Sequence, residues 1–157
     1  MPEGSDIFYI DETGFDEFYS REYGYAKRGE KVIGKIKGRK FARTNVVAAK
    51  CNDRFVAPFA FSGKMDAALF EGWLEEIFVK HLKNTENSVI ILDNAPFHRK
   101  DAINEVAAEY GFSVIFLPPY SPDFNLIENS WAIIKHRLRI CMHNFTCFWD
   151  SIIHVFK

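Results

Sequence analysis

Residues 89–96 read Val-Ile-Ile-Leu-Asp-Asn-Ala-Pro, an apolar run followed by a polar turn. Four apolar residues followed at once by a polar turn are typical of a buried strand, here one that ends at Asp93. A second apolar run, Val114–Leu117, stops at a proline-rich turn and leads into a helical pattern with Glu128 near its start. In open α/β sheets, active sites form at the carboxyl ends of strands and the first turns of the following helices. We therefore expect Asp93 and Glu128 to share one cleft.

A third acid of this kind stands near the N-terminus. The run Asp6–Asp11 is apolar and also ends on an acid, and we expect Thr13-Gly14-Phe15 to break this strand. Glu12 points to the other side of an extended strand and is not assigned to the same site. Three acids at one sheet edge repel one another unless a cation lies between them, and Mg²⁺ is the obvious candidate. Two such ions, roughly 4 Å apart, can activate a nucleophile and stabilise the leaving oxygen in phosphodiester chemistry.

Each acid also has a purely structural interpretation. Asp11 could cap a turn, and Asp93 could form an Asx-turn before Pro96. The spacing Asn125-x-x-Glu128 fits a capping box, in which Glu128 would bond a backbone N–H group. Spacing alone leaves both interpretations open.

The rest of the chain supplies the elements of a mixed sheet. The runs 44–51 and 54–61 flank the turn pair Asn52-Asp53 and predict an antiparallel hairpin, with Pro58 placing the second strand at an edge or at a bulge. Helical spacing predicts helices from an N-cap at Asp66 to His81, over Lys100–Tyr110 before a C-capping Gly111, from Ile127 to Leu138, and after Cys141. This order predicts an α/β fold, a mixed five-stranded sheet flanked by helices, with the first, fourth and fifth strands parallel.

Composition favours one globular domain over residues 1–157. The chain has three cysteines, and because they lack a paired framework we expect a reducing, cytoplasmic location. The cluster Cys141-Met142-His143 with Cys147 fits no zinc spacing. The sequence contains no apolar stretch of about eighteen residues and nothing that resembles a signal peptide.

Charge is distributed unevenly, although the net charge is only −1. Residues 27–50 hold nine basic side chains and one acid, whereas residues 1–26 hold seven acids and one base. The basic residues are Lys27, Arg28, Lys31, Lys35, Lys37, Arg39, Lys40, Arg43 and Lys50. A basic strip beside a cation-holding acidic site would suit a nucleic-acid phosphate backbone. A solvated, charged hairpin would have the same composition, and the sequence does not decide between them.

Three motifs resemble those of the DDE transposases of the mariner superfamily, specifically its bacterial insertion-sequence branch. They are Asp11-Glu12-Thr13-Gly14-Phe15, Leu92-Asp93-Asn94-Ala95-Pro96-Phe97-His98, and the stretch from Tyr120-Ser121-Pro122-Asp123 to Trp131. Between Asp93 and Glu128 lie 34 residues, the spacing typical of that superfamily's second and third catalytic acids. The resemblance implies an RNase H-like fold and two Mg²⁺ ions, replaceable by Mn²⁺, held by Asp11, Asp93 and Glu128. It also implies DNA strand cleavage followed by strand transfer.

The same resemblance sets expectations about partners. Members of the family carry N-terminal helix-turn-helix domains, and because nothing before Asp6 could form one we expect this chain to be a catalytic half. Its expected partners are double-stranded DNA, at transposon ends and target, and the DNA-binding half of the same element, while a homodimer stays open. Lys35, Lys37, Arg39 and Lys40 are expected to contact DNA phosphates, and His98 either contacts the scissile phosphate or is a surface histidine. The alternatives to an active transposase are an inactive remnant that binds DNA or transposase, and another RNase H-like nuclease such as a junction resolvase.

Overall fold

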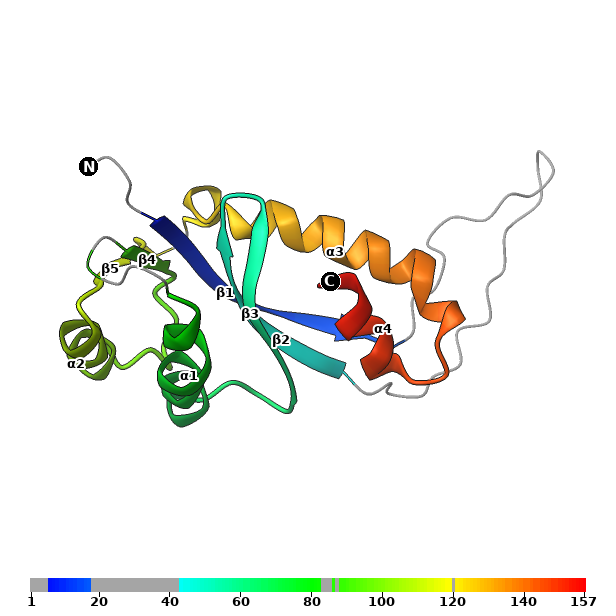
Figure 1. Ribbon diagram of the computed structural model, residues 1–157, viewed down its shortest axis with the longest axis horizontal. Helices are drawn as coiled ribbons and strands as arrows, with labels where there is room; N and C mark the ends of the chain where they lie inside the picture. Colours follow the sequence, from blue (N-terminus) through cyan, green and yellow to red (C-terminus); the bar gives the residue numbers. More distant parts are fainter. Residues whose placement is uncertain (1–5, 18–42, 83–85, 87, 120) are drawn as a thin grey trace.

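One mixed sheet with helices on both faces forms the described part of the molecule (Figure 1). The computed structural model describes residues 6–17, 43–82, 86, 88–119 and 121–157. The strands are β1 (Asp6–Asp16), β2 (Arg43–Cys51), β3 (Arg54–Ser62), β4 (Ser88–Leu92) and β5 (Ser113–Phe116). The helices are α1 (Ala67–Trp73), α2 (Lys100–Tyr110), α3 (Ile127–Cys141) and α4 (Phe148–Val155). The predicted DNA contacts Lys35, Lys37, Arg39 and Lys40 lie outside the described residues.

The sheet has the strand order β3-β2-β1-β4-β5. β1 and β4 are parallel, as are β4 and β5, whereas β1, β2 and β3 form an antiparallel meander. The predicted parallel arrangement of the first, fourth and fifth strands is thus confirmed. The carboxyl ends of β4 and β5 consequently lie at the same edge, beside the middle of β1, where Asp11 follows the last residue paired with β4.

The hairpin β2–β3 confirms the interpretation of Asn52-Asp53 and Pro58. Asn52 has a φ of 53°, which is the left-handed backbone that such a turn requires. β3 is an edge strand, and the register between β2 and β3 shifts between Val47 and Ala49. Ala57, next to Pro58, also has a φ of 53°, and its carbonyl accepts a 3.0 Å hydrogen bond from Trp73 Nε1. The proline therefore lies both at an edge and at a bulge.

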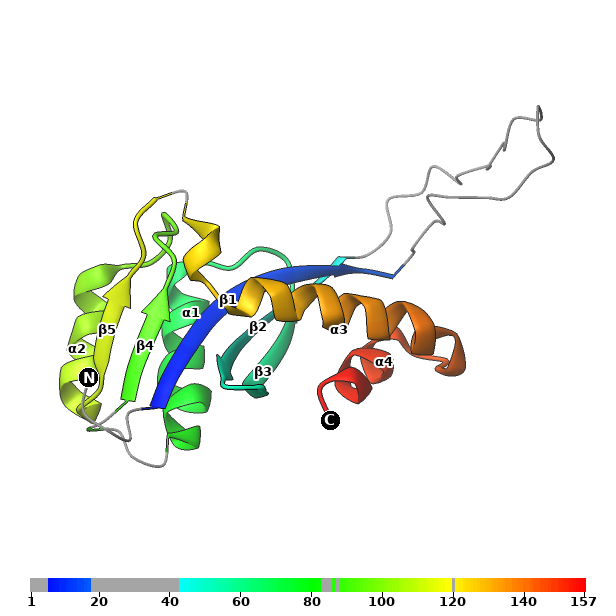
Figure 2. The same ribbon diagram turned by 90° about the horizontal axis from the view of Figure 1, so that it is seen from above.

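Two hydrophobic cores lie on opposite faces of the sheet. The first packs α1 and α2 on residues such as Phe8, Ile10 and Ile90. The second packs α3 and α4 on Phe15 and Val46, and Figure 2 shows α3 running beside the distal half of β1. β1 contributes residues to both cores, and Asp11 lies between those that pack in the first core and Phe15 in the second.

β1 is longer than the sequence predicted. The expected break at Thr13-Gly14-Phe15 is absent, and the strand continues to Asp16, paired with β2. The reason is tertiary packing, because Phe15 is fully buried with its ring centroid 6.3 Å from that of Trp131 and 6.4 Å from that of Phe156. Gly14 lies beneath the guanidinium of Arg43, which crosses the strand where a larger side chain would stand.

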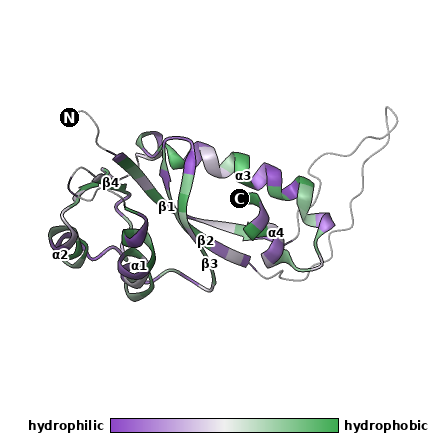
Figure 3. Cartoon of the chain, viewed as in Figure 1, coloured by the Kyte–Doolittle hydropathy of each residue, from purple (hydrophilic) through white to green (hydrophobic). Residues whose placement is uncertain are grey.

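The helix ends agree closely with the sequence. Asp66 caps α1, accepting a 2.8 Å hydrogen bond from Leu69 N, and the chain then continues through a π-helical turn and a 3₁₀ turn to His81. Gly111 ends α2 with a φ of 81°. Hydrophilic and hydrophobic residues alternate along α3 in Figure 3, because its buried stripe faces the sheet and its other residues face solvent. Within the described ranges, no helix combines the length and apolarity needed to cross a membrane.

Candidate active site

Asp11, Asp93 and Glu128 line one cleft of about 410 Å³. They come from three elements: the middle of β1, the turn after β4, and the first turn of α3. The structure therefore brings together the three acids that the sequence predicted to share a site. Residues 94–96 and 117–119, together with Ser121 and Asn125, complete the lining.

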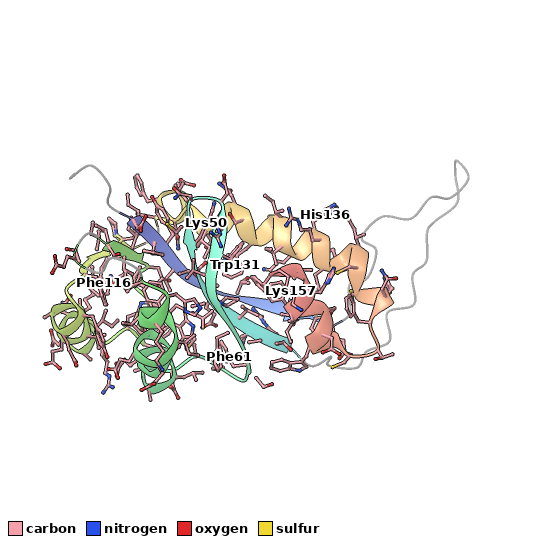
Figure 4. All side chains as sticks on the ribbon, viewed as in Figure 1. Lys50, Phe61, Phe116, Trp131, His136 and Lys157 are labelled. Carbon is pink, nitrogen blue, oxygen red and sulfur yellow. The ribbon has the colours of Figure 1, made fainter. Side chains whose placement is uncertain are left out.

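Asp11 is the first residue of β1 beyond the end of its pairing with the parallel strand β4. The β1–β4 pairing ends at Ile10 opposite Leu92, so the side chain of Asp11 reaches the open edge of the parallel half of the sheet. Its Oδ2 accepts a 3.0 Å hydrogen bond from Trp131 Nε1 on α3. Figure 4 shows Trp131 directed from α3 toward the sheet, while His136 on the same helix lies on its outer side. Asp11 does not cap a turn, because it lies inside a strand.

Burial raises the pKa of Asp11 from its ordinary value of 3.8 to about 7. The negative charges of Glu128 and Asp93 push the pKa in the same direction, while hydrogen bonds from the Glu12 backbone and from Trp131 oppose the shift. Both other acids therefore lie close enough to Asp11 for their charges to be felt. A cation in the cleft would relieve this repulsion and the cost of burying the charge.

Asp93 is held by the turn that follows β4. Its Oδ1 accepts a 3.3 Å hydrogen bond from Ala95 N, so the predicted Asx-turn is present. The side chain is nevertheless half-exposed and lines the cleft, so the turn fixes Asp93 in place and leaves it open to the cleft. The structural and the functional interpretations of Asp93 are therefore compatible.

His98 is a buried side chain rather than a surface histidine. Only 4% of its side chain is exposed, and its ring lies 4.4 Å, centroid to centroid, from both Phe70 and Phe97. Its Nδ1 lies 3.2 Å from the carbonyl oxygen of Asp93 and 3.3 Å from Asp93 Oδ1. Burial lowers the pKa of His98, which favours the neutral ring. Because both neighbours of Nδ1 are acceptors, the proton belongs on Nδ1, from which it holds the Asp93 turn.

The capping box suggested by Asn125 and Glu128 is not formed. The N-cap of α3 is Leu126, which makes no side-chain capping bond, and Glu128 N donates to the backbone carbonyl of Asn125 at 3.1 Å. The side chain of Glu128 is thus free to face the cleft. Asn125 is only 4% exposed, and its Oδ1 is buried without a hydrogen-bond partner.

Glu12 lies on the opposite side of β1, as strand alternation predicted. It lines a second, smaller pocket of about 180 Å³, together with Asp11, Asp93 and His98. Burial raises the pKa of Glu12, Arg43 counters this shift, and Asp93 adds to it. The Oε2 of Glu12 is buried without a hydrogen-bond partner. Glu12 therefore adjoins the backs of the two aspartates without entering the main cleft.

Sequence reasoning missed two features of this site. The spacing of Trp131 placed it on the apolar stripe of α3, and nothing in the sequence indicated that its Nε1–H would meet an acid 120 residues away. The sequence predicts Asn125 as a helix cap, whereas in the structure it is buried and lines the cleft. Both signals depend on how α3 packs against the sheet.

The donor chemistry of the cleft suits a hard divalent cation. Three carboxylates line it, and burial, with the charges of Glu128 and Asp93 in addition, raises the pKa of Asp11. Among the residues that the structure describes, no three His, Cys, Asp or Glu side chains are grouped closely enough to hold a metal ion. The three acids therefore suit a divalent cation by their chemistry and their common cleft, although they do not form a complete set of ligands around one point.

Known structures share this fold. The Mos1 transposase in its paired-end complex with a left transposon end matches 96% of the chain and 52% of its own length, with a TM-score of 0.71 at 16% identity. The catalytic core domain of BIV integrase matches 98% of the chain and 82% of its own length, with a TM-score of 0.58 at 13% identity. An intasome of simian T-cell lymphotropic virus matches 97% of the chain and 47% of its own, with a TM-score of 0.61 at 16% identity. At these identities the likeness establishes an RNase H-like fold and nothing more.

The chain spans about half the length of the Mos1 transposase. No curated protein sequence matches it significantly. A sequence profile described as DDE superfamily endonuclease matches residues 6–148, which is most of the chain and includes all three acids. The chain therefore belongs to the DDE superfamily endonuclease family.

Proposed function

We propose that this chain is the catalytic domain of a transposase, which cleaves DNA strands and joins the freed ends to a target with the help of divalent cations. The observation that carries the proposal is the common cleft of Asp11, Asp93 and Glu128, contributed by three separate elements of an RNase H-like fold. The Mos1 transposase supports it, since that protein has been solved with transposon ends and in a strand transfer complex. The bacterial insertion-sequence branch of the family is part of the same proposal.

Asp11, Asp93 and Glu128 would hold the cations, two Mg²⁺ ions that Mn²⁺ can replace. The paired-end complexes of Mos1 have been solved both with Mn and with Mg, which supports this choice. When bound, divalent ions supply a nucleophile of lowered pKa and stabilise the leaving oxygen of an in-line phosphoryl displacement.

The residues of the chain itself supply positioning. Trp131 fixes one oxygen of Asp11 by its 3.0 Å hydrogen bond and thereby ties the strand acid to the helix that carries Glu128. His98 holds the turn that carries Asp93, and the ring is itself fixed between Phe70 and Phe97. The carboxylates of Asp11 and Asp93 are therefore held by buried, packed side chains, which suits a site that acts by orientation and electrostatics.

The proposed partners are double-stranded DNA, at transposon ends and target, and a separate DNA-binding half of the same element. Lys35, Lys37, Arg39 and Lys40 would contact phosphates. The buried position of His98 favours a positioning role over contact with the scissile phosphate.

The test is cleavage of a DNA duplex that carries the ends of the element encoding the chain. We expect strand cleavage with Mg²⁺ or Mn²⁺ and none in chelator, both with and without the separate DNA-binding half of the same element. Asp93→Asn should abolish cleavage while leaving the fold intact, whereas Asp150→Asn, an exposed acid on α4, should leave cleavage unchanged. A chain that binds DNA but cleaves nothing under any of these conditions would be the inactive remnant.

A further inference from the structure

Two buried side-chain oxygens lack a hydrogen-bond partner among the described residues, and both lie at the acidic edge of the sheet. They are Glu12 Oε2 and Asn125 Oδ1. An unpaired buried acceptor costs roughly 1–3 kcal/mol, so such groups in folded proteins usually meet an ordered water, an ion or a ligand. Their concentration at one place therefore points to something that the site binds.

Asn125 carries the argument further than Glu12. It is 96% buried, since its exposed fraction is 4%, and it lines the same cleft as Asp11, Asp93 and Glu128. Its backbone carbonyl is already engaged by Glu128 N at 3.1 Å, which fixes the residue one helical turn from Glu128. The side chain does not cap α3, so the ordinary structural reason for an asparagine at this position does not apply.

The lining of the cleft shows what could satisfy this oxygen. An amide oxygen accepts hydrogen bonds or binds a cation, and the neighbouring carboxylates, when ionised, can do only the same. The described residues that line the cleft include no lysine, arginine or histidine. The hydroxyl of Ser121 is directed to the carbonyl of Pro119 at 3.5 Å. The cleft thus gathers oxygen acceptors without a protein cation, and amide and carboxylate oxygens are the ligands that Mg²⁺ and Mn²⁺ prefer.

We infer that Asn125 is a fourth oxygen donor of the cation site, binding through Oδ1 the ion that Glu128 helps to hold. This inference rests on the proposed function, because it presupposes that the three acids bind a divalent cation. It adds to the site a neutral ligand, which contributes to affinity without adding to the repulsion among the three carboxylates.

Calorimetric titration with Mn²⁺ alone, in the absence of DNA, tests the inference. Asn125→Leu keeps much of the side-chain volume and removes the oxygen, and we expect it to weaken Mn²⁺ binding at least tenfold. Asn125→Asp restores an oxygen at the same position and should bind Mn²⁺ at least as tightly as the wild type. The matched control is Asn129→Leu, an exposed asparagine on α3 that should leave Mn²⁺ affinity unchanged.

Thermal unfolding separates a ligand from a structural residue. Because Oδ1 makes no hydrogen bond in the protein, Asn125→Leu should unfold in chelator at the wild-type temperature or above it. Its temperature rise on adding Mn²⁺ should be smaller than that of the wild type.

The outcomes distinguish this inference from the proposed function. If Asn125→Leu binds Mn²⁺ as tightly as the wild type while Asp93→Asn does not bind it, the role of Asn125 is refuted and the function stands. If Asn125→Leu lowers the unfolding temperature equally with and without Mn²⁺, Asn125 is structural and the inference is again refuted. A wild-type chain that binds no Mn²⁺ would refute both.

Discussion

Asp11 must be ionised to bind a cation, but its burial makes the ionised form costly for folding. Its pKa of about 7 in the folded chain, against 3.8 ordinarily, means that between these values the folded protein keeps a proton that the unfolded chain has lost. The free energy of unfolding therefore falls as pH rises through this window, and above it the full cost of the buried charge remains. That cost is up to roughly 4 kcal/mol without a cation.

We predict that, in chelator, Asp11→Asn removes most of the fall in the free energy of unfolding between pH 4 and pH 8. The variant should be more stable than the wild type at pH 8 and nearly equal to it at pH 4, as measured by urea unfolding. Glu12, whose pKa is also raised, and His98, whose pKa is lowered, act equally in both proteins, so the difference between the two curves isolates Asp11. Parallel curves for wild type and variant would contradict the prediction.

Substitutions of His98 can show which of its two ring nitrogens matters for cleavage. The amide nitrogen of asparagine can replace Nδ1 of histidine, whereas that of glutamine replaces Nε2. If Nδ1 holds the Asp93 turn, His98→Asn should retain more cleavage than His98→Gln, and His98→Leu should lose roughly tenfold, which corresponds to about 1.4 kcal/mol. The measurement is the rate of metal-dependent cleavage. Rescue by glutamine instead of asparagine would favour contact with phosphate through Nε2.

At the scale of elements, β1 is the strand on which both layers depend. Phe8 and Ile10 pack in the core of α1 and α2, and Phe15 is the fully buried side chain that β1 places in the core of α3 and α4. The length of β1 therefore decides whether α3, and with it Glu128, can dock.

Phe15→Ala should lower the free energy of unfolding by about 3–5 kcal/mol, as expected for a fully buried phenylalanine. Phe124→Ala is the control, because Phe124 is 65% exposed and its loss should cost little. Urea unfolding of both variants measures the difference. A loss below about 1 kcal/mol at position 15 would be typical of an exposed residue and would mean that the strand ends before it.

The elements that the sequence predicted well are those with local signals. The run before Asp93, the glycine after α2 and the cap at Asp66 depend on neighbouring residues alone, and the structure has each of them as predicted. The grouping of the three acids followed from topology, since parallel strands end at one edge. What local signals could not supply were contacts made across the chain: the extension of β1 by Phe15 packing, the Trp131 hydrogen bond and the burial of His98.

At the scale of the whole molecule, we expect DNA affinity and cleavage to depend on different parts of the chain. The predicted phosphate contacts are outside the described residues and belong to the stretch 27–50, which holds nine of the 20 lysines and arginines, whereas the cleft is acidic. Phosphate contacts supply affinity without reading sequence, and base contacts usually come from a recognition helix. We therefore expect binding that depends on salt and not on sequence.

Replacing Lys35, Lys37, Arg39 and Lys40 with Ala should weaken binding to all duplexes alike. The slope of log affinity against log salt should fall by roughly 0.9 for each phosphate that the variant no longer neutralises. Fluorescence anisotropy over a range of salt concentrations measures both effects. A control with four exposed basic residues elsewhere changed to Ala should keep most of the wild-type slope; these are Lys64, Lys80, Arg137 and Lys157. Preference of the isolated chain for the element's inverted repeats would show that recognition resides in this domain.

The contribution of three separate elements to one cleft has a consequence for synthesis. A ribosome delivers Asp11 first, Asp93 next and Glu128 last, and at about 5–20 residues per second roughly ten seconds separate the first acid from the third. Until α3 emerges and seats Trp131 against Asp11, the nascent chain has two of its three acids and an uncovered sheet face. The proposed nuclease therefore lacks its third carboxylate until α3 has been synthesised.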